Sequence, residues 1–190
     1  IRLSLVGSEM CIRDSINTGV LKGAKAVLGF HNYPTLKVGE FAIKSGAITS
    51  AVDRFEFNVK GKGAHAAKPE QGNDPVIVVG QLINSLQTIV SRNLSAFDSA
   101  VVTIGEISCG NTWNVIADKA YIQGTVRSFD EDIRHYIENR MKNIADGLSR
   151  VFNVDIDLTY SRLPGAVVND AHLTQEAIEV AKNVGYHVSM

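Results

Sequence analysis

Apolar side chains occupy every second position in four segments of the chain. In the clearest of them, Phe55, Phe57 and Val59 alternate with polar residues. A period of two puts the apolar residues on one face of a β-strand, so each segment is predicted to be a half-buried strand. The four segments lie within residues 55–60, 102–104, 121–127 and 154–160.

Two further segments carry apolar residues at helical spacing. Asp74 and Pro75, an N-cap residue followed by proline at the first helical position, open the first and predict an amphipathic helix over roughly 75–92. Ser128 and Glu131 precede the second with the spacing of a capping box, in which hydroxyl and carboxylate each bond a backbone N–H. The apolar face of the second helix consists of Ile133, Ile137, Met141, Ile144, Leu148 and Val151.

These elements follow one another as strand, helix, strand, strand, helix, strand. That order predicts an α+β fold, the ferredoxin-like βαββαβ arrangement, with a four-stranded antiparallel sheet and two helices on one face. The other face of the sheet would be open or would meet a partner. Three segments fall outside this domain: residues 24–31, expected to be a strand buried on both faces, residues 39–44, a further short strand, and residues 171–183, a helix.

Composition narrows the class of protein. Of the 190 residues, 45% are hydrophobic and 21% charged, which is typical of a globular protein. The net charge of -1 gives no reason to expect a nucleic acid or an anionic membrane as partner. No apolar run is long enough to cross a bilayer. The two cysteines, Cys11 and Cys109, form no disulfide framework, and a reducing, cytoplasmic location is expected.

Both ends of the sequence look cut. Residues 1–15 carry neither helical nor strand periodicity and resemble a translated sequencing adaptor joined to a gene fragment. The alternative is an ordinary surface strand and loop. The chain has no initiator Met, and it stops at Met190 directly after the strand-like residues 186–188.

Four polar residues stand where packing alone would not require them. His31 ends the predicted buried strand, a place where α/β sheets bind ligands and where imidazole can ligate a metal. His65 follows the glycine-rich residues 61–63, where backbone can approach a ligand closely. Asn114 lies in a turn between strands. Arg127 lies at the end of a strand, and its guanidinium can bind a carboxylate through two hydrogen bonds. Taken singly, each also fits a structural role: a hydrogen-bonded histidine, a loop histidine, a turn asparagine and a solvated edge charge.

Common catalytic motifs are missing from the sequence. No Ser-His-Asp set, Walker loop or CxxC pair appears. The glycine-rich residues 61–65 are not a phosphate loop, because no helix follows them directly and the Lys-Ser/Thr ending is absent. Spacing alone therefore predicts a ferredoxin-like domain with an anion site.

Six short motifs in a single order add a resemblance across residues 16–190. The run resembles the metallopeptidase family of hippurate hydrolases, N-acyl amino acid aminoacylases and indole-acetyl amino acid hydrolases. The motifs are GFHNYP at 29–34, GKGAHAAKP at 61–69, DP at 74–75, LQTIVSRN at 86–93, WNVIAD at 113–118 and GTVRSFD at 124–130.

The resemblance implies a lid domain that pairs with a second subunit, and a centre of two divalent metal ions, zinc, manganese or similar, in the other domain. His31 matches a metal-ligand position. His65 matches the lid histidine that reaches the active site of the partner subunit, where it would polarise the scissile carbonyl and stabilise the oxyanion. Asn114 and Arg127 match lid residues that bind the substrate carboxylate. Ala117 departs from the proline usual in the family, a mild change to the loop.

The implied reaction is hydrolysis of the amide bond of N-acyl amino acids of the hippurate or N-acetyl type. In the family, two metals bridge a hydroxide and a glutamate carries the proton to the leaving amine. That glutamate, a Cys-x-His motif, a Glu-Glu pair and the last histidine ligand are not found in this sequence. The glutamate pair would stand just before Gly19, and Glu9 is no convincing substitute. The parent protein is thus expected to be an enzyme, and this polypeptide alone to be inactive.

The resulting domain organisation has four parts. Residues 1–15 are non-native, 16–49 belong to an α/β catalytic domain, 50–161 form the lid and dimerisation domain, and 162–190 start the C-terminal part of the catalytic domain. One alternative is a non-catalytic dimerisation or small-ligand-binding module, which would have no use for His31 and the strand before it. An RNA-binding sheet is the other alternative, which the lack of paired aromatics and of basic charge disfavours.

Overall fold

The computed structural model describes residues 16–189. The predicted non-native segment, 1–15, and Met190 lie outside these described residues. Contacts divide the chain into two units: residues 50–165 form one, and the segments before and after them form the other. The assignment of those flanking segments to a catalytic domain stays a prediction.

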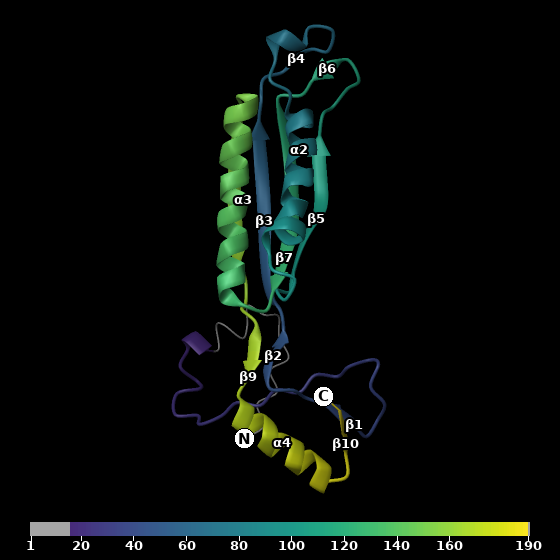
Figure 1. The fold of residues 1–190 in the computed structure, drawn as a ribbon, viewed down its shortest axis with the longest axis vertical. Helices are drawn as coiled ribbons and strands as arrows, with labels where there is room; N and C mark the ends of the chain where they lie inside the picture. Colours follow the sequence, from purple (N-terminus) through teal and green to yellow (C-terminus); the bar gives the residue numbers. More distant parts are fainter. Residues whose placement is uncertain (1–15, 190) are drawn as a thin grey trace. The chain divides into compact units, whose positions relative to one another are not determined.

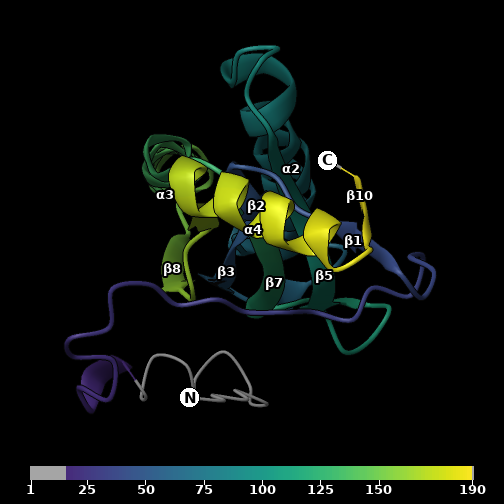
Figure 2. The ribbon, with the colours of Figure 1, turned by 90° about the horizontal axis from the view of Figure 1, so that it is seen from below.

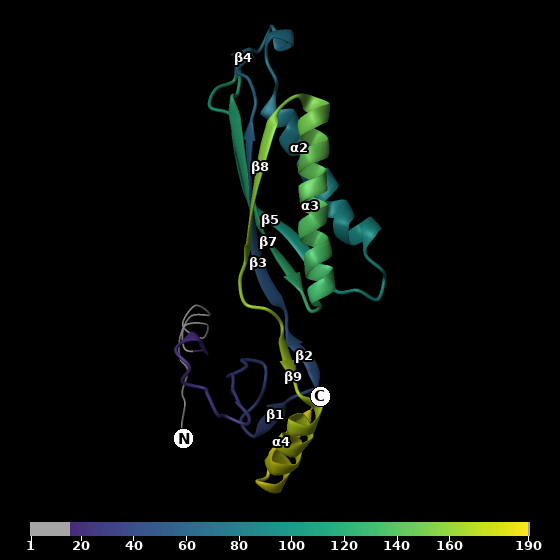
Figure 3. The same cartoon turned by 90° about the vertical axis from the view of Figure 1, so that its left-hand side faces the viewer.

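Residues 50–165 contain the predicted four-stranded antiparallel sheet, with the strands in the order β5-β7-β3-β8 (Figure 2). Helices α2 and α3 lie on the same side of this sheet (Figure 3). Chain order and strand order together confirm the ferredoxin-like arrangement. The elements of this unit are β3 (Ala51–Lys60), β4 (Ala64–His65), η1 (Pro69–Gln71), α2 (Pro75–Thr88), η2 (Ile89–Asn93), β5 (Ala100–Cys109), β6 (Val115–Ile116), β7 (Lys119–Ser128), α3 (Glu131–Phe152) and β8 (Asp155–Arg162).

The core lies between the sheet and the two helices. Phe57 is directly opposite Ile122 on β7 and Leu158 on β8, so apolar residues face the helices in register across the sheet. Burying a side chain of this size stabilises a fold by about 1.5–3 kcal/mol. A Cβ at Gly124 would collide with the Phe55 ring and with the carbonyl of Thr103, which explains the glycine in the central strand β7. The largest fully buried core residues are Phe55, Phe57, Leu82, Leu86, Ile89, Ile122, Ile137 and Met141.

The two helix starts differ in how they match the sequence. At α2 the prediction is confirmed: the Asp74 carboxylate accepts from the Val76 N–H at 2.8 Å. The predicted helix over 75–92 divides into α2 and the π-helical segment η2.

The predicted capping box at the start of α3 is wrong. The N-cap is Asp130, whose Oδ1 accepts from the N–H groups of Asp132 and Ile133. Ser128 is instead the last residue of β7, where it pairs with Ala51 and Ala100. Because those strand contacts continue to residue 128, the helix cannot begin there. The Ser128 hydroxyl is buried and has no hydrogen-bond partner among the described residues.

The second unit has short strands and one helix. Strand β1 pairs in parallel with β10, and β2 pairs antiparallel with β9. The predicted helix over 171–183 is confirmed as α4 (Figure 1). The Asp170 carboxylate caps it by accepting from the Leu173 N–H. Its elements are β1 (Glu40–Ala42), β2 (Gly46–Thr49), β9 (Val167–Asn169), α4 (Ala171–Asn183) and β10 (His187–Ser189).

The predicted buried strand over residues 24–31 is wrong. The segment forms no strand, and Val27, Leu28 and Phe30 are each more than half exposed. A strand buried on both faces needs neighbouring strands and covering helices, and the described residues provide neither for this segment. Within residues 16–189, none of the helices combines the length and apolar character needed to span a membrane.

Candidate functional site

A two-stranded ribbon lies beyond the ends of β3 and β5 and carries two of the predicted site residues (Figure 1). Strands β4 and β6 pair antiparallel, with Ala64 opposite Ile116 and His65 opposite Val115. The Ala66 N–H donates to the Asn114 carbonyl at 3.0 Å. The structure therefore brings His65 and Asn114 together from two loops that are far apart in sequence.

The ribbon is anchored to the start of α2. The segment after β3 pairs with the loop before α2 through two hydrogen bonds between Lys62 and Asn73, of 3.0 and 2.9 Å. A Cβ at Gly72 would lie 2.7 Å from the Lys62 carbonyl oxygen and 2.9 Å from the Ala64 Cβ, so only glycine permits this approach. The glycine-rich sequence thus serves close backbone packing, which sets the position of His65.

His65 itself is exposed, but its ring is fixed. The imidazole Nδ1 accepts a hydrogen bond from the Ala67 N–H at 3.0 Å. The His65 carbonyl accepts from the Lys68 N–H at 2.8 Å, closing a turn around the histidine. The other ring nitrogen, Nε2, has no partner among the described residues.

Asn114 is half-buried and uses its backbone to hold the ribbon. Its side-chain oxygen has a weak contact of 3.4 Å from the Thr112 hydroxyl. Next to it, Trp113 is 92% exposed. The ribbon therefore presents an imidazole, an amide and an indole to the outside.

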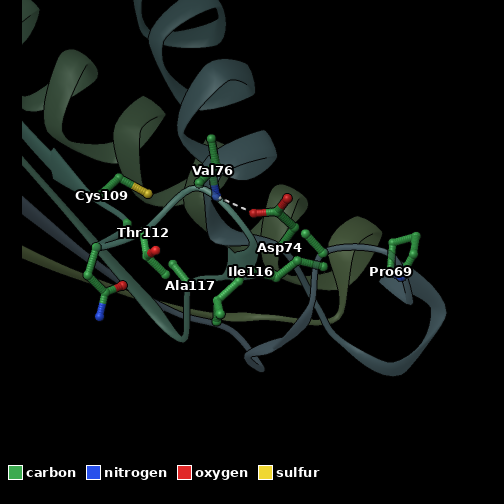
Figure 4. Close-up of a pocket in the computed structure, with 11 residues that line it drawn as sticks. Pro69, Asp74, Val76, Cys109, Thr112, Ile116 and Ala117 are labelled. Atoms are coloured by element: carbon green, nitrogen blue, oxygen red, sulfur yellow. Dashed lines mark hydrogen bonds between the residues drawn. The ribbon is translucent and has the colours of Figure 1, made fainter.

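A cavity of about 650 Å³ lies beside the ribbon (Figure 4). Asp74 faces it, but that carboxylate caps α2 through Val76. Burial, and then the nearby Asp74 carboxylate, raise the pKa of the Cys109 thiol. The thiol is consequently protonated at neutral pH and poorly suited to be a nucleophile. Residues lining the cavity include Ala66, Asp74, Val76, Cys109, Thr112 and Ile116.

Arg127 lies at the other end of the sheet. Its neighbours in register are Val52 on β3 and Val101 on β5. Strand β7 begins at Lys119, so eight steps along an extended strand place Arg127 roughly 27 Å from that end. The Arg127 side chain is exposed and has no ion pair within the described chain. One chain therefore does not bring Arg127 together with His65 and Asn114.

His31 lies in the other unit, exposed and outside any helix or strand. Across residues 16–189, no three side chains of His, Cys, Asp or Glu come together in a way that could hold a metal ion. The described residues thus do not by themselves fit a centre of two metal ions.

The sequence interpretation missed a buried charge cluster where the chain enters and leaves residues 50–165. Asp53 is 1% exposed and accepts from Arg134 Nε at 2.8 Å, from the Tyr160 hydroxyl at 2.9 Å and from the Leu163 N–H at 3.3 Å. Arg134 also donates to the Leu163 carbonyl. Burial, together with the Asp53 charge, raises the pKa of Tyr160 well above its usual range. The sequence does carry a signal for this cluster: Asp53, two positions before Phe55, falls on the apolar face of the predicted strand.

Comparison with known proteins gives a consistent result. The model of a peptidase dimerisation domain matches residues 38–151. N-acetylcysteine deacetylase of Bacillus subtilis (strain 168) is 38% identical over 174 residues, covering 92% of this chain and 46% of the relative. N-acetyl-L-cysteine deacetylase of the same strain is 43% identical over 159 residues, covering 84% of this chain and 38% of the relative.

Among solved structures, a dinuclear metal binding peptidase from the M20 family of Bacillus subtilis superimposes with a TM-score of 0.76 at 33% identity. The match covers 93% of this chain and 44% of that chain. The chain therefore spans less than half the length of each of these relatives.

Proposed function

This chain belongs to the M20 peptidase family and contains its dimerisation domain, and we propose that the complete protein hydrolyses the amide bond of N-acyl amino acids with the help of divalent metal ions. The names of the relatives support this reaction class, since two of them are deacetylases of N-acetylcysteine. The observation that carries the proposal is the ribbon, whose paired backbone brings an exposed histidine, His65, and a half-buried asparagine, Asn114, close together from two distant loops.

Each of the three predicted site residues in this domain has a chemical role in the proposal. The outward Nε2–H of His65 donates a hydrogen bond to the carbonyl oxygen of the scissile amide and stabilises the negative charge that develops there. The amide of Asn114 and the guanidinium of Arg127 bind the substrate carboxylate, Arg127 by the two parallel bonds that its planar fork permits.

These roles require two copies of the chain. Arg127 and the ribbon are separated by roughly 27 Å along β7, farther than one N-acyl amino acid reaches. A homodimer resolves this, because a two-fold axis places the ribbon end of one copy beside the Arg127 end of the other.

The edge strand β5 is the surface we propose for this pairing. Its outer edge is unpaired within the sheet, and an open edge is a template for another strand. Val101 and Ile107 on β5 are about half exposed, as are Val76 and Ile77 on the adjoining helix α2. Two copies of β5 related by a two-fold axis pair antiparallel. The ribbon end of one copy then lies beside the Arg127 end of the other.

Two divalent ions, zinc, manganese or similar, complete the proposal, with His31 as one ligand. Imidazole suits such ions. The remaining ligands must come from residues other than those described, because no ligand cluster forms among residues 16–189. When bound, such ions would supply a nucleophilic hydroxide at neutral pH. We also propose a cytoplasmic location for the complete protein.

The test uses the complete gene and this 190-residue chain side by side. Hydrolysis of N-acetyl amino acids, including N-acetylcysteine, and of hippurate is measured with added Zn²⁺ or Mn²⁺ and after chelation. We expect metal-dependent hydrolysis by the complete protein and none by the chain alone. An active complete protein that is indifferent to chelators, or inactive on every N-acyl amino acid tried, would refute the proposal.

The cavity beside the ribbon supports a second candidate, a module that binds a small ligand without catalysis. Calorimetry of the chain with N-acetylcysteine separates the two: binding by the chain, with no turnover by the complete protein, would favour this module. The RNA-binding alternative has less support. On the open sheet face Tyr121 bonds to Glu56 and Gln123 rather than standing free to stack on a base.

A further inference from the structure

The turn around His65 leaves one backbone N–H directed at the ring. The Ala66 N–H is used by the Asn114 carbonyl and the Lys68 N–H by the His65 carbonyl. The Ala67 N–H, between them, donates to His65 Nδ1 at 3.0 Å. A backbone N–H can only donate, so the nitrogen that accepts from it cannot carry a proton. In a neutral imidazole the single proton must then be on Nε2.

We propose that the backbone amide of Ala67 is a positioning group that holds His65 as the Nε2–H tautomer, with its one remaining ring donor directed outward. Use of this donor on a substrate carbonyl rests on the proposed function. The tautomer itself is a property of this chain and needs neither substrate nor metal.

This arrangement determines what His65 can do. With Nδ1 bonded to Ala67 and a proton on Nε2, the neutral ring has no free lone pair with which to accept a proton or ligate a metal. It can only donate. The same turn that joins His65 to the ribbon thus makes it a stabiliser of oxygen charge rather than a base or a metal ligand.

The chain offers a matched pair of substitutions. His65→Asn puts a side-chain oxygen where Nδ1 stands, and asparagine readily accepts from the N–H two residues on. It has no atom at the Nε2 position. His65→Ala removes both groups. The first variant therefore keeps the bond from Ala67, and the second loses it.

The primary experiment is NMR of the ¹⁵N-labelled 190-residue chain at alkaline pH, where imidazoles are neutral. We expect a through-hydrogen-bond ¹⁵N–¹⁵N correlation between Ala67 N and His65 Nδ1, and a proton on Nε2. His31 and His187, for which the described residues provide no ring hydrogen bond, serve as references and should divide the proton between both nitrogens. A His65 ring that behaves like these references, or that carries its proton on Nδ1, would overturn the proposal.

Amide hydrogen exchange gives the second readout. His65→Ala should speed exchange of the Ala67 N–H by about tenfold, the loss of one ordinary hydrogen bond. His65→Asn should keep the Ala67 rate within about threefold of the original. The amides of Ala66 and Lys68 report whether the ribbon is intact. The proposal is contradicted if the Ala67 N–H loses equal protection from exchange in both variants while exchange of the Ala66 and Lys68 amides is unchanged. If a variant disrupts the ribbon, the spectrum of the unmodified chain decides. Hydrolysis by the complete protein can fail without altering these spectra, so the two proposals fail separately.

Discussion

The two ends of the four-stranded sheet hold their polar side chains by different means. At one end Arg134 and Tyr160 both donate to the buried Asp53 carboxylate, and these hydrogen bonds join β3, α3 and β8. At the other end backbone hydrogen bonds hold the ribbon, while His65 stays exposed. Side chains used in a buried network stabilise the domain and are closed to ligands. A ribbon held by its backbone leaves its side chains open for chemistry.

Asp53→Ala should have the largest effect on stability. It removes the buried carboxylate that pairs with Arg134 and leaves the buried guanidinium with only the exposed Glu131 as ion-pair partner, and we expect a loss of about 3–5 kcal/mol in the free energy of unfolding. Urea unfolding followed by circular dichroism measures it. The matched control is Lys60→Ala, which breaks the exposed pair with Asp157 and should cost about 0–1 kcal/mol. Equal effects of the two substitutions would mean that the buried network is not special.

Tyr160→Phe tests the same network through its pH dependence. Removing the hydroxyl that donates to Asp53 should cost about 1.5–3 kcal/mol at neutral pH. The pKa of Tyr160 is raised in the folded state, so this stability is complete below the ordinary tyrosine pKa of 10.0 and declines above it. The difference in unfolding free energy between the original chain and the variant should therefore shrink as pH rises above 10.0. Tyr136→Phe, at a tyrosine outside the network, is the control and should cost less unfolding free energy than Tyr160→Phe at neutral pH.

A third prediction concerns the start of α3, which lies at the Asp53 end. Asp130→Ala should destabilise the domain by about 1 kcal/mol, because two backbone N–H groups lose their acceptor. Ser128→Ala should be neutral or stabilising, since its buried hydroxyl has no partner among the described residues. Thermal unfolding of both variants checks this. A larger destabilisation by Ser128→Ala than by Asp130→Ala would support the capping box predicted from the sequence.

The smallest expected effect on stability belongs to the ribbon. His65→Ala should change the free energy of unfolding by less than about 0.5 kcal/mol, as at other exposed positions. In the complete protein the same change should lower kcat by about 100- to 1,000-fold, the usual loss for a donor to an oxyanion. Urea unfolding of the chain and steady-state kinetics of the complete protein measure the two effects. A large loss of stability with little loss of kcat would reverse the comparison between the two ends.

The elements whose signal is local could be predicted from the sequence. Period-two alternation predicted β3 and its buried face, and helical spacing predicted α3 and α4. Asp74 and Pro75 marked the start of α2. These features follow from which face of a strand or helix meets the core, and neighbouring residues carry that information. Motif order also led to the family and to four candidate residues, whose roles stay predictions.

How distant residues meet could be read from the fold and not from local sequence patterns. Ser128 has the spacing of a cap but is held in a strand by Ala51 and Ala100. Residues 24–31 have the composition of a buried strand but pair with no strand among residues 16–189. The pairing of His65 with Val115 joins two segments that are far apart in sequence, whereas the bond from Ala67 to the His65 ring is local and depends on the turn next to that pairing. Hydrogen bonds between segments far apart in sequence leave no periodic signal, and the ribbon that they form holds the local turn in which Ala67 donates to the His65 ring.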